Sequence, residues 1–299
     1  MTPLNMALRG SPKTVGLGKT SLARAALLDM CTLIESLADR PTHVSELVRF
    51  PTVAEGCVDA SSLGAGGVWF GEFFEPTVWR VPFPDDIVKM YKDGTLTNSD
   101  LEMAGVLIQN MVLEQLQPME RMHSATHSDN TPATSWASKL ASKSGSPVAG
   151  HLIRALAMRQ RTTMSAMPSV VYWPGVVNTL ADTASRSFSV FHYGPCRGLP
   201  SVTDQEFLNH FASTFPLPQP KLWTLVLPNP ALLSNAMSTL RGKRLPMQRW
   251  MQSPAYGTGN CGKPTVISTA STTFSSGTTP PDRLHLPVPY THLRAHDTT

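Results

Sequence analysis

The feature that most constrains the fold is an alternation of short apolar strands with amphipathic helices between residues 51 and 190. Three strands come first, and helices then separate the remaining two. Strands joined through helices run parallel, whereas strands joined by short turns run antiparallel. The order β-β-β-α-β-α-α-β-α therefore predicts an α/β fold. Its mixed five-stranded sheet has three antiparallel and two further parallel strands, with helices on both faces.

The same pattern predicts the position of each element in this region. The expected strands are Gly56–Ala60, Val68–Phe74, Thr77–Val81, 120–128 and Ser169–Trp173. The expected helices are Leu101–Leu116, Pro132–Leu140, Val148–Arg161 and Leu180–Arg186. Gly and Ser residues predict a turn over Ser61–Gly67, and Phe83–Asp86 predicts a solvated loop.

Two flanking regions differ in composition from this core. Residues 1–50 predict a connector with one helix, Ser21–Asp39, whose core-facing side is Leu22, Ala25, Leu28, Cys31, Ile34 and Leu37. Residues 191–299 hold more than half of the 26 prolines and predict a largely irregular spacer. Its expected helices are Asp204–Ser213 and Ala231–Arg241, and Gly257–Thr279 is expected to be disordered.

Composition limits the classes of protein to which the chain can belong. Charged residues make up only 15% of the chain, which excludes a coiled coil. No apolar run reaches the roughly 18 residues of a membrane span, so we expect an intracellular protein without a membrane partner. The four cysteines are far apart, which argues against a disulfide framework or a cysteine zinc site. The net charge of +4 is compatible with a polyanionic partner.

Four acidic residues fall at the ends of predicted elements where ligands bind in α/β sheets. Asp59 and Asp129 end strands whose carboxyl ends should be neighbours, and Glu102 and Asp182 begin helices. Clustered carboxylates repel one another unless cations compensate them. Oxygen ligands favour Mg²⁺ or Mn²⁺. Two such ions would activate a water and stabilise the leaving oxygen of a phosphodiester.

Three of these residues also have a structural explanation. Ser99-x-x-Glu102 matches a capping box, Asp129 can cap the following helix, and Asp182 can complement a helix N-terminus. Asp59 is harder to explain in this way, because an acidic residue that ends an apolar strand is rarely structural. His123 and His127 fall on one face of a strand without a glutamate partner, so we expect no zinc site there.

Four stretches in order resemble the ribonuclease H domain of retroelement reverse transcriptase/ribonuclease H polyproteins, of the kind found in tyrosine-recombinase retrotransposons. The resemblance covers about residues 50–190. The stretches are Cys57–Trp69, Asn98–Glu102, Ser128–Pro132 with Trp136, and Tyr172–Arg186, which is similar to the closing PGxxNxxADxxSR signature. Residues 1–50 resemble the connector that follows the polymerase thumb, and residues 190–245 resemble the spacer after the domain.

The resemblance implies cleavage of the RNA strand of an RNA–DNA hybrid, with the reverse transcriptase domain of the same polyprotein as a partner that this chain lacks. Asp59, Glu102, Asp129 and Asp182 would be the catalytic metal ligands. Asn130 and Asn178 would contact phosphates or sugar hydroxyls of the substrate, or alternatively form turns and caps. Cellular members of the family carry a mobile histidine that helps proton transfer or product release, and the turn Tyr172–Gly175 lacks it.

Two other functions remain possible at this stage. The domain could be a catalytically degenerate module that only binds nucleic acid or packs against a polymerase. A phosphate-loop nucleotide hydrolase is disfavoured, because Gly16–Thr20 lacks the first glycine of that motif at position 13 and no strand precedes it. The C-terminal stretch Tyr290–His296 resembles translated sequencing-adapter DNA and is expected to carry no function.

Overall fold

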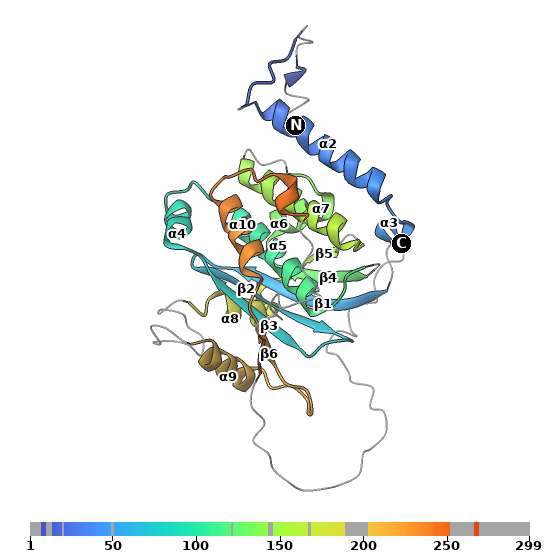
Figure 1. Ribbon diagram of the computed structural model, residues 1–299. Helices are drawn as coiled ribbons and strands as arrows, with labels where there is room; N and C mark the ends of the chain where they lie inside the picture. Colours follow the sequence, from blue (N-terminus) through green and yellow to red (C-terminus); the bar gives the residue numbers. More distant parts are fainter. Residues whose placement is uncertain are drawn as a thin grey trace, which may run out of the picture. The chain divides into compact units, whose positions relative to one another are not determined.

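The computed structural model describes residues 7–9, 14–19, 21–48, 51–120, 122–142, 146–166, 169–188, 203–251 and 266–268. These residues form a seven-stranded mixed sheet with helices on both faces (Figure 1). The strands are β1 Thr52–Ala60, β2 Gly64–Gly71, β3 Thr77–Pro82, β4 His123–Ser128, β5 Ser169–Tyr172, β6 Thr224–Val226 and β7 Val266–Ser268. The α-helices are α2 Leu22–Asp39, α3 Val44–Leu47, α4 Asp85–Lys92, α5 Asn98–Leu116, α6 Thr131–Lys139, α7 Pro147–Thr163, α8 Thr179–Ser185, α9 Asp204–Thr214 and α10 Pro230–Leu240, with 3-10 turns η1 Gly175–Val177 and η2 Met247–Arg249.

The strand order is β5-β4-β1-β2-β3-β6-β7. As predicted, β1 pairs antiparallel with β2 and β2 with β3, while β4 runs parallel to both β1 and β5. The predicted number of five strands was wrong. β6 pairs parallel with β3 and β7 antiparallel with β6, so a region predicted to be largely irregular extends the sheet.

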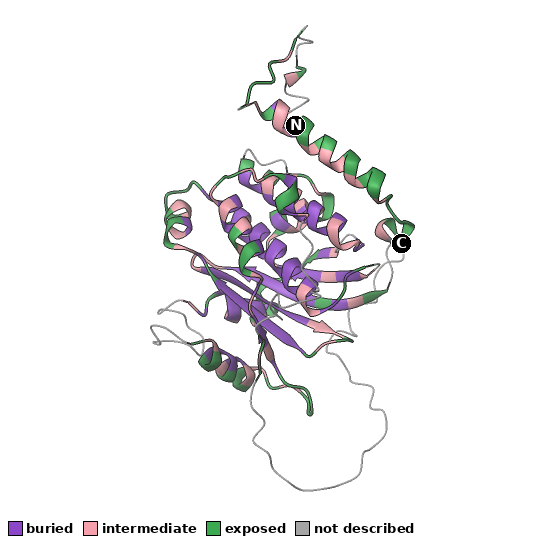
Figure 2. Cartoon of the chain, in the orientation of Figure 1, coloured by how far each residue is buried: buried purple, intermediate pink, exposed green. Residues whose placement is uncertain are grey.

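Two hydrophobic clusters hold the layers together. On one face of the sheet, helices α5, α6, α7 and α10 pack over β1–β5, and every residue from Asp100 to Glu114 of α5 is buried. On the other face, α8 and α9 cover β2, β3 and β6 with an aromatic cluster of Phe207, Phe211 and Trp223. Figure 2 shows the sheet as largely buried, whereas the outward sides of α2 and α9 are exposed.

The turn predicted over Ser61–Gly67 was wrong, because its four C-terminal residues belong to strand β2. The turn is shorter: the Ser61 N–H donates to the Gly64 carbonyl at 2.8 Å. Glycine is required inside this strand by packing. A Cβ on Gly66 would lie 2.6 Å from the Ala184 Cβ and the Ser185 backbone nitrogen of helix α8. Gly66 therefore lets α8 approach the sheet closely.

The loop predicted at Phe83–Asp86 was also wrong in part, because Asp85 begins helix α4. Pro84 occupies the N-cap position, where a missing N–H costs nothing. Asp85 and Asp86 lie in the first turn, where acidic side chains complement the helix dipole. The buried Ile87 then anchors the helix on the main core.

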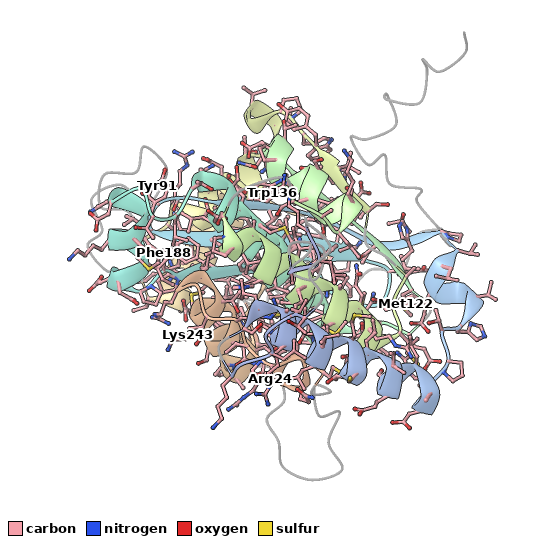
Figure 3. All side chains as sticks on the ribbon, turned by 90° about the horizontal axis from the view of Figure 1, so that it is seen from above. Arg24, Tyr91, Met122, Trp136, Phe188 and Lys243 are labelled. Atoms are coloured by element: carbon pink, nitrogen blue, oxygen red, sulfur yellow. The ribbon has the colours of Figure 1, made fainter. Side chains whose placement is uncertain are left out.

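Helix α2 is confirmed, but its predicted core-facing side was wrong. Leu28 is 57% exposed and Ile34 is 60% exposed. The helix instead buries Ala23 and Ala26 and packs Leu33 against the main cluster, and the Asp29 carboxylate accepts hydrogen bonds from Arg154 and Arg244. In Figure 3, α2, with Arg24 labelled, runs alongside the segment after α10, where Lys243 is labelled. The side of the helix that meets the domain therefore combines apolar residues with an acidic residue that two arginines bind.

The C-terminal part of the described chain contributes to the same body. Helices α9 and α10 are close to their predicted bounds, and the fully buried Trp250 accepts a hydrogen bond at its carbonyl from Arg159 of α7. Strand β7 contradicts the disorder expected at Val266–Ser268. The rest of the segment expected to be disordered lies outside the described residues, as do Cys196, Cys261 and Tyr290–His296. Among the described helices, none has the length and apolar character needed to cross a bilayer.

Candidate metal centre

Three of the four predicted carboxylates come together at one edge of the sheet. One oxygen each from Asp59, Glu102 and Asp129 lies within 4.8 Å of the others. Asp59 is near the end of β1, and Asp129 directly follows β4. Because these strands pair in parallel, their carboxyl ends are neighbours, and the first turns of α5 add Glu102 from the adjoining layer.

Asp59 is 4% exposed and accepts a short hydrogen bond from the Ser185 hydroxyl of α8. Burial raises the pKa of Asp59 to about 6, with smaller contributions from the negative charges of Asp182 and Asp129. The Ser185 hydrogen bond acts in the opposite direction, since it stabilises the ionised form. Ser185 is thus a neighbour of the site that sequence reasoning missed, although it lies within the closing motif.

Glu102 is 2% exposed, and burial together with the charges of Asp59 and Asp129 raises its pKa well above the usual range. The Ala60 N–H donates a hydrogen bond to this carboxylate. Its Oε2 atom is buried and has no hydrogen-bond partner among the described residues. The capping alternative for Glu102 was wrong, because Thr97 and Asp100 form the capping box of α5.

Asp129 is half-buried, and burial raises its pKa, with a further contribution from Asp182. It is not needed as a helix cap, because the Asn130 side chain accepts the Ala133 N–H at 2.9 Å and caps α6. A Cβ on Gly175 would lie 2.6 Å from the Asp129 Oδ2 atom, so the backbone of η1 passes directly beside this carboxylate.

Asp182 does not join the three converging carboxylates. It lies in the first turn of α8, and its Oδ1 atom is 2.5 Å from the Arg186 Nε atom one turn further along the helix. Its charge still contributes to the raised pKa of Asp59 and of Asp129. The sequence analysis placed all four acids at one rim and left aside Arg186, whose position four residues after Asp182 is the sequence signal for this ion pair.

The two asparagines predicted to contact substrate have structural partners. Asn178 is 1% exposed, and its Nδ2 atom donates to the Val58 carbonyl at 3.0 Å, which ties the start of α8 to β1. Asn130 caps α6, as described above. On the same side, the Ser61 hydroxyl donates to the Ser185 carbonyl at 2.9 Å. These bonds position α8 and therefore the hydroxyl that meets Asp59.

The two histidines of β4 lie on one sheet face, and each contacts residues of the neighbouring strands. His127 Nε2 lies 2.7 Å from a Glu55 carboxylate oxygen, and its ring stacks on Trp173 at 4.2 Å. His123 contacts Thr52 and Ser169. Across the described parts of the chain, Asp59, Glu102 and Asp129 are the one group with metal-ligand geometry.

The donor set fits a divalent cation. It consists of carboxylate oxygens alone, which Mg²⁺ and Mn²⁺ prefer over nitrogen and sulfur. The partnerless, buried Oε2 atom of Glu102 and the raised pKa values both indicate negative charge that the protein itself leaves uncompensated. Comparison of the sequence with models of known families finds no match, and comparison with curated proteins finds none either.

Proposed function

We propose that the protein is a metal-dependent endoribonuclease of the ribonuclease H type, which cleaves the RNA strand of RNA–DNA hybrids as part of a retrotransposon polyprotein. The observation that carries the proposal is the convergence of Asp59, Glu102 and Asp129 at the carboxyl ends of β1 and β4. The order of the motifs that bear these residues supports the same function. A seven-stranded mixed sheet is compatible with a ribonuclease H-like fold.

The protein's own groups give this site its chemical character. Asp59 lies between β2 and β4, where Ser185 fixes one of its carboxylate oxygens. The Ala60 N–H fixes the Glu102 carboxylate, while the Oε2 atom of that residue stays available as a ligand. Two Mg²⁺ or Mn²⁺ ions bound there would activate a water and stabilise the leaving oxygen of the phosphodiester.

A cleavage assay on a labelled RNA–DNA hybrid tests the proposal. We expect the chain to cut the RNA strand with Mg²⁺ or Mn²⁺, and to leave double-stranded DNA and the EDTA-treated reaction uncut. Asp59→Asn should lower the rate by at least about 100-fold, as for groups that stabilise developing charge. Asp86→Asn is a matched control, because Asp86 is an exposed carboxylate on α4 that pairs with Arg241. Equal cleavage by the wild-type protein and Asp59→Asn would reject the proposal.

One observation favours a second candidate, a domain of the same fold that binds nucleic acid without cutting it. The ion pair with Arg186 engages Asp182, so one of the four predicted ligands is not free. This candidate predicts hybrid binding in a gel-shift assay with no cleavage, even at millimolar Mn²⁺. Cleavage that depends on Asp59 would exclude it.

A further inference from the structure

We propose that Arg186 is a built-in counter-ion of the acidic centre, which holds Asp182 in the metal-free protein and gives it up when a second divalent ion binds. Arg186 would then be a positioning residue that sets the affinity of the centre for its second ion. The inference rests on the proposed metal-dependent function and deepens it.

The first observation is the geometry of helix α8 and its end. Arg186 follows the helix directly and lies four residues after Asp182, so both side chains are on the same side. The Arg186 Nε atom is 2.5 Å from Asp182 Oδ1. Both side chains are partly open to solvent, at 51% and 36% exposed. The pair can therefore separate without disturbing the core.

The second observation is electrostatic. The positive charge of Arg186 lowers the pKa of Asp59, of Glu102 and of Asp129, against the upward effect of burial. Among the described residues, Arg186 is the cation that acts on all three of these carboxylates. The guanidinium thus supplies part of the compensation that the three converging carboxylates need, in the place of a metal ion.

The third observation is that the four predicted ligands differ in the partners they already have. Glu102 keeps a buried Oε2 atom without a partner, whereas Asp182 has a cationic partner. A first ion therefore meets ligands that are ready for it, but a second ion that needs Asp182 must compete with Arg186. An exposed ion pair is weak, so a divalent cation can displace it. The guanidinium also repels an approaching ion, which weakens the second binding step further.

Titration of the full chain with Mn²⁺ tests this inference, with free Mn²⁺ followed by electron paramagnetic resonance. We expect one tighter and one weaker class of site in the wild-type protein. Arg186→Ala should strengthen the weaker class by about tenfold, because it removes both the competitor and its repulsion. Arg241→Ala is the matched control, because Arg241 at the end of α10 also forms a surface pair with an aspartate, but its charge does not act on Asp59, Glu102 or Asp129. An unchanged Mn²⁺ isotherm for Arg186→Ala would overturn the inference.

A double-mutant cycle separates competition for Asp182 from a general effect of charge. We expect the gain from Arg186→Ala to be mostly lost in an Asp182→Asn background, since the contested ligand is then absent. An equal gain in both backgrounds would mean that Arg186 acts only through its distant charge, and would also overturn the inference. Thermal unfolding of each variant in EDTA checks that the fold is retained.

Nuclear magnetic resonance gives a second measurement, which follows the ion pair in the wild-type protein itself. The Arg186 Nε–H signal, assigned by its loss in Arg186→Lys, should shift when Mg²⁺ is added, because its partner changes from carboxylate to water. A signal that saturating Mg²⁺ does not move would contradict release. Failure of the proposed function is distinguishable: if Arg186→Ala binds Mn²⁺ more tightly but no variant cuts the hybrid, the counter-ion role stands and the nuclease assignment falls.

Discussion

Asp59 lies in the buried C-terminal part of β1, where an ionised carboxylate is costly unless a cation compensates it. Its pKa of about 6 in the folded protein lies above the ordinary value of 3.8. The folded state therefore binds the proton more tightly than the unfolded state does. This favourable contribution is fully present below about pH 4 and is lost as the pH rises through about 6.

The metal-free protein should therefore be less stable at pH 7.5 than at pH 5, by about 1.4 kcal/mol for Asp59 alone. Asp59→Asn should remove this part of the dependence and be more stable than the wild-type protein at pH 7.5 in EDTA. Urea unfolding of both proteins at the two pH values measures the difference. A wild-type protein that matches Asp59→Asn at pH 7.5 would contradict the buried-carboxylate explanation.

Ser185 is the residue through which helix α8 acts on the centre, since its hydroxyl donates to the Asp59 carboxylate. Removing this donor should raise the pKa of Asp59 further, because the hydrogen bond stabilises the ionised form. We expect Ser185→Ala to weaken Mn²⁺ binding by about tenfold at pH 7, as for outer partners of metal ligands.

The deficit of Ser185→Ala should shrink above pH 8, where Asp59 is ionised in both proteins. Ser187→Ala is the control, because the Ser187 hydroxyl donates to the Ala184 carbonyl and contacts Arg80 rather than a carboxylate. Calorimetric Mn²⁺ titrations at several pH values measure both. A deficit that is the same at every pH would indicate a general loss of structure rather than an effect on Asp59.

At the scale of elements, the close contact between β2 and α8 sets the position of Ser185 and Asp182. A Cβ at Gly66 would collide with the backbone of Ser185, which cannot move without shifting the helix. We expect Gly66→Ala to lower the free energy of unfolding by about 1–3 kcal/mol, as for overpacking of a core, and to weaken Mn²⁺ binding.

Gly150→Ala is the matched control for Gly66→Ala. A Cβ at Gly150 of helix α7 meets nothing within 4 Å, so alanine should stabilise the protein by about 0.5–1 kcal/mol through helix propensity. Urea unfolding curves give both values. If Gly66→Ala were as stable as Gly150→Ala, the close approach of α8 would not be what fixes the site.

The sequence predicts helices and strands best where one signal dominates. Apolar residues at a spacing of three and a terminating Pro41 predict helix α2 correctly. They do not predict its orientation, which Asp29 sets by pairing with arginines from distant parts of the chain. Gly64–Gly67 carry the composition of a turn, yet packing against α8 and Gln109 makes them a strand. Both errors arise from contacts made at long sequence separation, which local patterns do not contain.

The candidate site was predicted well because its signal is local: each acid follows or begins a recognisable element. The three converging residues, Asp59, Glu102 and Asp129, were all identified in this way. The pairing of Asp182 with Arg186 and the role of Ser185 were not predicted, because they depend on side-chain directions at the end of a short helix. A search for arginine four residues after a predicted ligand would have found the pair.

At the scale of the whole molecule, the region after residue 203 is part of the folded body. β6 covers the edge of β3, and Phe207 and Phe211 bury Val68 and Val78 of the sheet. On the opposite face, the buried Arg159 of α7 pairs with Glu114 and also donates to the Trp250 carbonyl. The abundant prolines of this region indicate loops but give no signal for the short elements between the loops. The contribution of these elements to the folded body was therefore not predicted.

Removing this region should therefore unfold the domain rather than release an intact core. A chain ending at residue 202 would expose the β3 edge and the aromatic cluster, and it would leave Arg159 without its carbonyl partner, a loss of buried contacts far larger than a domain's usual net stability. We expect it to show no cooperative thermal transition by circular dichroism and no Mn²⁺ binding.

A chain ending at residue 251 is the control, because it keeps α9, β6, α10 and Trp250 and loses only the three-residue β7 from the described structure. It should melt cooperatively, within a few degrees of the full chain. Cooperative melting of the shorter chain would instead show that the domain folds without the region after residue 202.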